Sequence, residues 1–437
     1  MEWPFLLLLI FGGMLFLMAT GMPIAFGFMT IVVIGAYVLY GGAVGIEQLV
    51  LSVFTKLTSF TLLPIPLFVL MGELMVHSGM AVNVIDVLGK CMGRIPGRLS
   101  LLTVAAGTVL STLTGASMAS TAVLGSVLVP EMESRGYKKS MILGPILGSG
   151  GLAMMIPPSA LAIILCSIGE ISIGKVLMAI IIPGLLMAFF YACYIILACL
   201  IKPSLAPSYE VAKTPLGEKL MGLVLYVMPT GVIVFLVIGF ILLGIATPSE
   251  SAASGTFGMV VLISLYRRLT WDVIKKSITG TLSVAGMVFL IIASANAFGQ
   301  ILSFTGATQG LTEFATQLPL HPIVMVITMQ IIILIMGGFM EPVCILMITL
   351  PVFVPFIVSL GFDTVWFATM VLLNIEMAMV TPPFGMCLFV MQGVTPEDTR
   401  ITDIYLSVVP FLLCDLIVMA LIIAFPSIAL WLPALMR

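Results

Sequence analysis

The chain has 437 residues, of which 61% are hydrophobic and 8% are charged, and its mean hydropathy is +1.29. Soluble globular chains are about 45–50% apolar and about 25% charged, so lipid must be the solvent for much of this chain. The formal net charge of -2 and the lack of a basic stripe in the sequence give no reason to expect nucleic acid as a partner.

The cysteines and histidines exclude several further classes of protein. The 7 cysteines are scattered without a C-x-x-C pair, and most sit in apolar runs, where a free cysteine behaves as a small hydrophobe. The two histidines, His77 and His321, are too few for a zinc site or a Ser-His-Asp triad. We therefore expect neither an enzyme nor a protein with a bound cofactor or structural metal.

Apolar stretches follow one another along the chain with short polar connections. Those long enough, or nearly so, for a ~20-residue transmembrane helix are 4–20, 22–41, 99–130, 140–168, 176–201, 217–245, 251–266, 321–341, 343–360, 363–392 and 406–433. The first lacks a basic start and a cleavage site, so we expect a retained span rather than a signal peptide. The sequence thus predicts an all-α polytopic membrane protein.

Two more apolar regions, 57–89 and 278–316, are interrupted in the middle. The interrupting residues are Pro64, Pro66, Asn296, Gly299 and Gly306. We expect each region to form a helical hairpin that enters and leaves the membrane on one side.

Prolines recur at one fixed shift along the sequence. The pairs are Pro4 with Pro229, Pro23 with Pro248, Pro130 with Pro355, Pro157 with Pro382, and Pro158 with Pro383. With 26 prolines in the chain, chance predicts fewer than one such pair among the ten prolines that lie between Met1 and Pro183. Accidental recurrence of helix-breaking prolines is the alternative, but we favour two structural repeats, 4–183 and 229–408. Repeats of this kind are typical of secondary transporters.

The repeats predict a division of the chain into four parts. We expect a first repeat with N-terminal scaffold helices and the first hairpin over 1–201, and a linker rich in proline and charge over 202–219. The second repeat with the second hairpin follows over 220–408, and a C-terminal helix covers 409–437. An odd number of crossings in each repeat would place the second upside down relative to the first.

Each repeat contains two segments that interrupt its apolar runs and that together are rich in Gly, Ser, Thr and Pro. They are 111–121 and 148–160 in the first repeat, and 336–344 and 380–385 in the second. Unwound backbone offers carbonyl oxygens to a hard cation such as Na⁺, and half-helix N-termini favour an anion. The pattern predicts two related cation sites near the midplane with an anionic substrate between them. For any single segment, close helix packing or a proline kink explains the composition equally well.

Four acidic residues lie in apolar surroundings. Glu341 lies inside the second break and is a default functional candidate. Glu73 and Glu376 are as consistent with a polar helix contact as with function, whereas Asp415 lies outside the repeats and is expected to be structural. Ser249 and Glu250 follow Pro248 at a predicted helix start, where helix capping is the favoured interpretation.

Six segments, in this order, resemble the DctM-type large membrane subunit of tripartite ATP-independent periplasmic (TRAP) transporters. They are LLPIPLFVLMGELM (62–75), LTGASMASTAVLG (113–125), GLAMMIPPSALAI (151–163), GIATPSESAASG (244–255), GGFMEPVCILMITLPVFVP (337–355) and VTPPFGMCLFV (380–390). The resemblance implies an inverted-repeat elevator transporter with two re-entrant hairpins and two broken helices. It also implies Na⁺ as the coupling ion, no use of ATP, and a bacterial or archaeal cytoplasmic (inner) membrane location. The implied partners are a small four-helix membrane subunit and a periplasmic substrate-binding protein.

The same resemblance implies site residues. A first sodium site would comprise Gly115, Ser117, Ser120, Gly151, Pro157 and Pro158. A second would comprise Gly337, Gly338, Glu341, Thr381, Pro382, Pro383 and Gly385. Family members often have Asp at position 341 and Asn at position 387, where this chain has Glu341 and Cys387, so the second site's side-chain ligands differ from the family pattern. No Arg lies in the proposed core, so Ser117, Ser159 and Thr381 are the candidate substrate contacts.

Four functions compete at this point. The first is a binding-protein-dependent, Na⁺-coupled carrier of a small organic anion, such as a dicarboxylate, sialic acid, sugar acid, keto acid or sulfonate. The second is a self-sufficient Na⁺- or H⁺-coupled carrier of the same broad fold. A membrane enzyme would need a nucleophile and a base, for which the sequence offers no pair, and a passive channel would not need matched broken helices. We favour the first.

Overall fold

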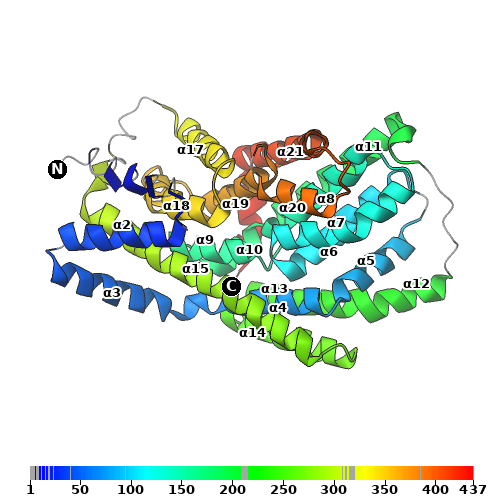
Figure 1. The fold of residues 1–437 in the computed structure, drawn as a ribbon, viewed down its shortest axis with the longest axis horizontal. Helices are drawn as coiled ribbons and strands as arrows, with labels where there is room; N and C mark the ends of the chain where they lie inside the picture. The colour runs from blue at the N-terminus through cyan, green and yellow to red at the C-terminus, as the bar shows by residue number, and fades with distance from the viewer. Residues whose placement is uncertain are drawn as a thin grey trace.

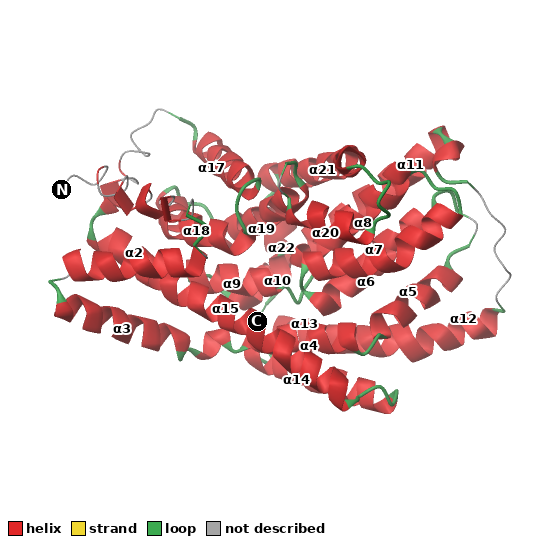
Figure 2. Cartoon of the chain, in the orientation of Figure 1, coloured by secondary structure: helices red, strands yellow, loops and turns green. Residues whose placement is uncertain are grey.

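A computed structural model describes the chain from residue 5 to residue 436, except 6–8, 11, 15, 18, 19, 23, 40, 94, 208–214, 308, 311, 312, 314–319 and 384. The described residues are helices joined by loops, with no strand among them (Figure 2). Pro4, Pro23 and part of the predicted span 4–20 lie outside the described residues, as do residues 208–214 of the predicted linker.

The helices of the first half precede residue 202. They are α2 (Ile24–Leu39), α3 (Ala43–Leu57), η1 (Phe60–Leu62), α4 (Pro64–His77), α5 (Met80–Cys91), α6 (Arg98–Thr114), α7 (Ser117–Ser134), α8 (Lys139–Met155), α9 (Ala160–Gly169), α10 (Ile173–Ala179) and α11 (Ile181–Ile201). The helices of the second half are η2 (Pro203–Leu205), α12 (Leu216–Gly222), η3 (Leu223–Val227), α13 (Met228–Leu242), α14 (Pro248–Leu265), α15 (Trp271–Phe304), α17 (Pro322–Gly337), α18 (Pro342–Ser359), α19 (Thr364–Val380), α20 (Met386–Val394), α21 (Ile401–Ala424) and α22 (Ser427–Ala434).

The helix bounds repeat along the chain at the shift that relates the prolines. This shift carries both ends of α7 onto the ends of α18, and both ends of α8 onto the ends of α19. It also carries α2 onto α14 and carries α3 and α4 together onto the single long helix α15. The predicted boundary between residues 219 and 220 falls inside α12, and the one between residues 408 and 409 falls inside α21.

Local sequence explains where α8 and α19 end. Ile156 and Thr381 each precede a proline and have extended backbones, because the proline ring clashes with a helical conformation of the residue before it. Each helix therefore stops one residue earlier, at Met155 and at Val380. At the start of α14, Thr247 and Glu250 form a capping box, which confirms the capping role predicted for Glu250. The capping role predicted for Ser249 was wrong, because its hydroxyl donates a 3.1 Å hydrogen bond to the carbonyl of Phe60 instead.

The helices form two groups. The peripheral group contains α2–α5 and α12–α15, in which α15 packs against α2, α3 and α4. The core group contains α6–α11 and α17–α22, in which α8 packs against α6, α7, α19 and α21. Figure 1 shows the peripheral group along the lower edge of the view and the core group above it. Every residue of Met141–Met155 in α8 and of Val365–Val380 in α19 is buried, so these two helices lie at the centre of the core group.

The structure corrects the predicted positions of the hairpins. Helix α15 runs unbroken through Asn296 and Gly299, because the preceding and following turns are apolar and helical hydrogen bonding tolerates a single glycine. In the region 57–89, the prolines start α4 rather than interrupt it, and the break falls at Ser78 and Gly79. The interruptions predicted at Pro64, Pro66, Asn296 and Gly299 were therefore wrong, but the region 57–89 does fold as two helices, α4 and α5, that pack against each other.

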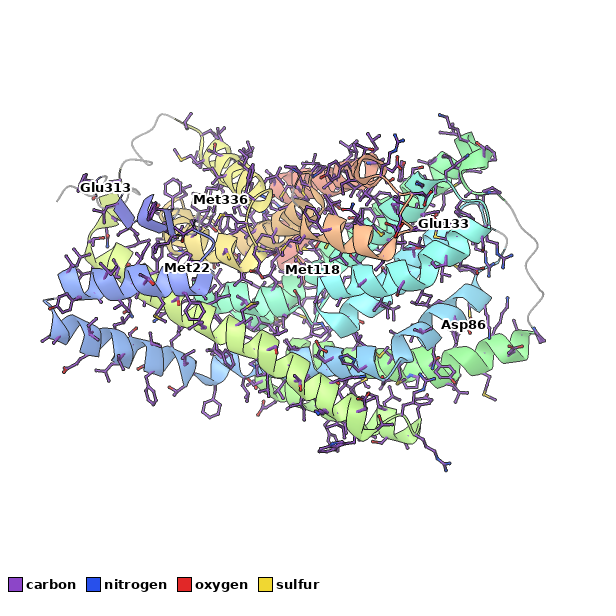
Figure 3. The ribbon with its side chains drawn as sticks, viewed as in Figure 1. Met22, Asp86, Met118, Glu133, Glu313 and Met336 are labelled. Atoms are coloured by element: carbon purple, nitrogen blue, oxygen red, sulfur yellow. The ribbon has the colours of Figure 1, made fainter. Side chains whose placement is uncertain are left out.

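A hairpin of the first half is also formed by α6 and α7, in the region predicted as the single span 99–130. These two helices pack against each other, and both pack against α8. Met118 in the first turn of α7 lies near the middle of the molecule, whereas Glu133 in its last turn lies toward one edge (Figure 3). The tip of this hairpin thus reaches the centre of the molecule. In the second half, α17 and α18 pack against each other as α6 and α7 do in the first.

The length and composition of the helices fit a lipid environment. Among the described residues, 6 helices are long and apolar enough to cross a membrane, and the pair α8 and α9, bent by 44°, raises the count to 7. Large apolar side chains such as Phe235, Phe257 and Leu406 are at least 70% exposed, as expected for surfaces that face lipid.

Candidate functional site

The break in the first hairpin rests on the first proline-proline loop. Helix α6 ends at Thr114, Gly115 has a φ of 58°, and α7 begins at Ser117. A side chain at position 115 would place its Cβ 3.0 Å from the carbonyl oxygen of Pro158, so only glycine allows this approach. The structure therefore brings Gly115 next to Pro158, as the first predicted site requires.

The loop between α8 and α9 is fully buried. Pro157, Pro158 and Ser159 are all buried, and the peptide bond between the two prolines is cis. Ser159 Oγ accepts a hydrogen bond of 3.3 Å from the backbone N–H of Ala162, which makes Ser159 the N-cap of α9. Accepting this bond leaves the hydroxyl proton of Ser159 available, so the contact of Ser159 with a substrate stays a prediction.

The break between α17 and α18 packs against α19. Helix α17 ends at Gly337, where an added Cβ would lie 2.1 Å from the Cβ of Ala378. Gly338 is buried, whereas Glu341 is half-buried at the N-cap of α18 without a capping hydrogen bond from its side chain. A carboxylate at this position lies at the positive end of the helix dipole.

The second proline-proline loop is more open than the first. Thr381 Oγ1 donates a 2.6 Å hydrogen bond to the carbonyl of Met377, one turn earlier in α19. Pro382 is half-buried and Pro383 exposed, and the carbonyl of Pro383 accepts a 2.8 Å hydrogen bond from the hydroxyl of Tyr405. Gly385 lies so close to the carbonyl of Met379 that an added Cβ would be 2.5 Å from its oxygen. The two predicted sites therefore share a plan but differ in exposure to solvent.

Glu376 joins the two halves of the core group. Its side chain is 1% exposed, and Ser117 Oγ donates a 3.1 Å hydrogen bond to its Oε2. An added Cβ at Gly151 would lie 1.3 Å from Glu376 Oε1, so the carboxylate occupies the space that a side chain at position 151 would fill. A residue of the second repeat thus contacts two residues of the first predicted sodium site, a contact that the sequence interpretation left open.

The other acidic residues of the apolar segments have partners elsewhere. Glu73 pairs with His77 at 3.1 Å on α4 and lies over Gly280 of α15. Asp415 is 1% exposed and accepts a hydrogen bond of 2.5 Å from the hydroxyl of Tyr191, which ties α21 to α11. Asp415 is also close enough to Glu376 to act on it electrostatically. The hydrogen bond with Tyr191 fits a structural role for Asp415, but its nearness to Glu376 does not fit a residue distant from the pore, so the role of Asp415 stays a prediction.

A large cavity lies between the two helix groups, at a distance from these breaks. It has a volume of about 1230 Å³ and lies between α3, α9, α15 and α18. Asn296 and Gln300 of α15 both donate to Ser52 Oγ on its wall, at 2.9 and 2.6 Å. Lys56 of α3 forms a 3.2 Å ion pair with Glu170, which ends α9 with a φ of 53°. This ion pair links the peripheral group to the core group.

The fold and the breaks together define a class of protein. An all-helical chain with several apolar spans, and with helices broken at small residues and prolines in its centre, is a multi-pass membrane transporter. The chain belongs to the family described as the tripartite ATP-independent periplasmic transporter, DctM component, whose model matches residues 11–428. The resemblance predicted from six segments and the inner-membrane location are confirmed.

Individual relatives cover nearly the whole chain. The C4-dicarboxylate TRAP transporter large permease protein DctM of Rhodobacter capsulatus is 31% identical over 98% of this chain and 99% of its own length. The ectoine TRAP transporter large permease protein TeaC of Halomonas elongata is 29% identical over 96% of this chain and 97% of its own. The structure of the YdaH transporter of Alcanivorax borkumensis matches with a TM-score of 0.66 and 16% identity over 91% of both chains, which supports the fold alone.

Proposed function

We propose that this chain is the large permease subunit of a binding-protein-dependent secondary transporter that takes up a small organic acid anion together with Na⁺. The observation that carries the proposal is the contact between the first hairpin break and the first proline-proline loop, where Gly115 meets the carbonyl of Pro158. Broken helices that meet inside a membrane protein are typical of ion and substrate sites in secondary transporters.

Sodium coupling is supported by the chemistry of the donors at the breaks. Hard cations prefer oxygen ligands, and the first break offers backbone carbonyls and the hydroxyls of Ser117 and Ser120. Ser117 donates its proton to Glu376, which leaves the lone pairs of its oxygen available to a cation. We assign a first sodium site to Gly115, Ser117, Ser120, Gly151, Pro157 and Pro158. We assign a second to Gly337, Gly338, Glu341, Thr381, Pro382, Pro383 and Gly385.

An anionic solute is supported by the helix ends at the breaks. Helices α7 and α18 begin at the two hairpin tips, and α9 and α20 begin after the proline-proline loops. Four half-helix N-termini of this kind favour negative charge. Ser117, Ser159 and Thr381 are the proposed hydroxyl contacts. The named relatives are transporters of C4-dicarboxylates and of ectoine.

In this proposal, the two helix groups are the parts that move relative to each other during transport. The core group carries the breaks and moves as an elevator against the peripheral group, and the cavity beside Lys56 is the solute pathway. The predicted division into 1–201, 202–219, 220–408 and 409–437 gives each repeat a share of both groups. The proposed partners are a small four-helix membrane subunit, bound to the peripheral group, and a periplasmic binding protein that delivers the solute. The alternative is a self-sufficient carrier.

Reconstitution tests the proposal directly. The chain would be purified with its small subunit, placed in liposomes, and supplied with binding proteins loaded with labelled organic acids. Uptake that needs both a binding protein and an inward Na⁺ gradient supports the proposal, and K⁺ in place of Na⁺ is the control. Uptake with Na⁺ but without a binding protein favours the self-sufficient carrier, and uptake indifferent to Na⁺ rejects both sodium sites.

A further inference from the structure

Two successive glycines of α8 form a cradle for polar groups from two other helices. Gly150 faces Thr121 of α7, whose Oγ1 would lie 2.0 Å from an added Cβ, and Gly151 faces the carboxylate of Glu376 in the same way. Thr121 lies one turn after Ser117, so both side chains point to the same side of α7. The cradle therefore gathers Ser117, Thr121 and Glu376 in a fully buried position.

The charge of this cluster is not balanced by a basic side chain. Within the described part of the chain, Glu376 forms no ion pair with Lys, Arg or His, and its hydrogen-bond donor is the hydroxyl of Ser117. The titratable groups near it are Asp415, Tyr191 and Cys387, none of which supplies positive charge. Burying an unpaired carboxylate is costly, so charged groups inside membrane proteins are retained where they bind ions or protons.

An unsatisfied hydroxyl points to a ligand at the same place. Thr121 Oγ1 is fully buried and makes no hydrogen bond of normal geometry within the described chain, although the thiol of Cys387 lies beside it and interacts with it. Buried hydroxyls nearly always have a partner, and a cation ligated by the oxygen would provide one. The cluster thus combines the carboxylate of Glu376, the hydroxyl oxygen of Thr121 and the lone pairs of Ser117.

We propose that Glu376 supplies the negative charge of the first sodium site, so that a residue of the second repeat completes a site built by the first. The inference rests on the proposed Na⁺ coupling and adds a residue to it. Glu376 accepts a hydrogen bond from Ser117 and lies against Gly151, and both of these residues belong to the first site. Na⁺ bound there neutralises the carboxylate, and Thr121 gives the ion a further oxygen. In the second site, the negative charge comes from Glu341, which lies at the break between α17 and α18.

Direct binding of radioactive sodium to the purified two-subunit membrane complex tests the inference separately from transport. The variants are Glu376→Gln, which keeps the shape and removes the charge, and Glu376→Asp, which keeps the charge. Glu73→Gln is the control, because it neutralises a membrane carboxylate that pairs with His77 outside the proposed sites. Size-exclusion profiles select folded protein, and Ser117→Ala serves as the second variant if Glu376→Gln does not fold.

We expect Glu376→Gln to weaken one sodium-binding component at least about 10-fold, the size expected when a charge-assisted contact is lost, and to spare the other component. Ser117→Ala should weaken the same component, whereas Glu73→Gln should bind as the wild type does. Unchanged sodium binding in Glu376→Gln, or in Ser117→Ala where it replaces that variant, overturns the inference and leaves Na⁺ coupling intact. A wild type that binds no sodium overturns the proposed coupling itself, and this inference with it.

Discussion

Glu376 lies against Gly151, its own counterpart in the first repeat. The shift that carries α8 onto α19 also carries Gly151 onto Glu376. Two equivalent residues that touch must lie next to the axis that relates the two repeats, as at any isologous contact. One member of the pair has no side chain, and this leaves room on the axis for the carboxylate of the other.

Gly151→Ala should therefore disrupt the core group. The added Cβ would fall 1.3 Å from Glu376 Oε1, and both helices are buried on every side, so the carboxylate must leave its position. Overpacking of this kind costs about 1–3 kcal/mol. We expect a lower melting temperature in detergent and loss of Na⁺-dependent uptake. Gly393→Ala in α20 is the control, because an added Cβ there meets nothing within 4 Å, and equal damage by both variants would contradict the prediction.

Ser117→Ala should raise the Na⁺ concentration needed for half-maximal uptake. The variant removes the 3.1 Å hydrogen bond to Glu376 and one oxygen of the first site. Hydrogen bonds to charged groups contribute about 1.5–3 kcal/mol, so a rise of about 10-fold or more is expected. Ser126→Ala, which loses a bond to its own helix backbone, should leave the Na⁺ dependence of uptake unchanged. A Ser117→Ala protein with wild-type Na⁺ dependence would remove Ser117 from the site.

Tyr191→Phe should lower stability without changing Na⁺ dependence. The variant leaves Asp415 buried without the hydroxyl that donates to it, and an unsatisfied buried group costs about 1–3 kcal/mol. The melting temperature of the detergent-solubilised complex measures the loss. Asp415→Asn, which can still hydrogen-bond Tyr191, should be milder. If Tyr191→Phe instead shifts the Na⁺ requirement of uptake, Asp415 takes part in coupling rather than in structure.

Breaking the ion pair between Lys56 and Glu170 should change the transport rate modestly, and exchanging the two charges should restore the rate. Their side chains are 19% and 76% exposed, and a pair of this kind is worth about 0.2–1 kcal/mol, or less than about 5-fold in rate. Lys56→Glu places two carboxylates together and should change the initial uptake rate within that range. The double reversal Lys56→Glu with Glu170→Lys should restore it, and high salt should mask both effects. A double variant no closer to wild type than the single one would show that the pair is incidental to transport.

Periodic and compositional signals predicted most of the fold. The apolar fraction gave the membrane class, and the proline shift gave the spacing that α7 with α18 and α8 with α19 now display. The interruption of the region 57–89 was misplaced, because a proline at the first turn of α4 looks the same in sequence as a proline within a span. The turn of the first hairpin needs only Gly115 and Ala116, too short an interruption to distinguish from a kink.

The candidate site was predicted only in part, and the reason differs from the one that applies to the fold. Gly115, Ser117 and the Pro157–Pro158 loop belong to short segments with unusual composition, and such segments can be read in sequence. Glu376 lies in an otherwise ordinary apolar helix, and its role depends on which helix faces it. One signal was available, namely that the proline shift pairs it with a glycine, but pairing by symmetry does not imply contact. Only packing in three dimensions places the two residues together.

Helix α15 is too long for the membrane it lies in. Its 34 residues at 1.5 Å each extend about 51 Å, against a hydrocarbon layer of about 30 Å. Unless it projects far into water, the helix must lie at a steep slant, and its tilt must follow the thickness of the surrounding lipid. Because α15 packs along α2, α3 and α4, a thinner or thicker bilayer would tip the whole peripheral group. The choice of lipid thereby becomes a variable of the transport cycle, alongside the solute and the ion.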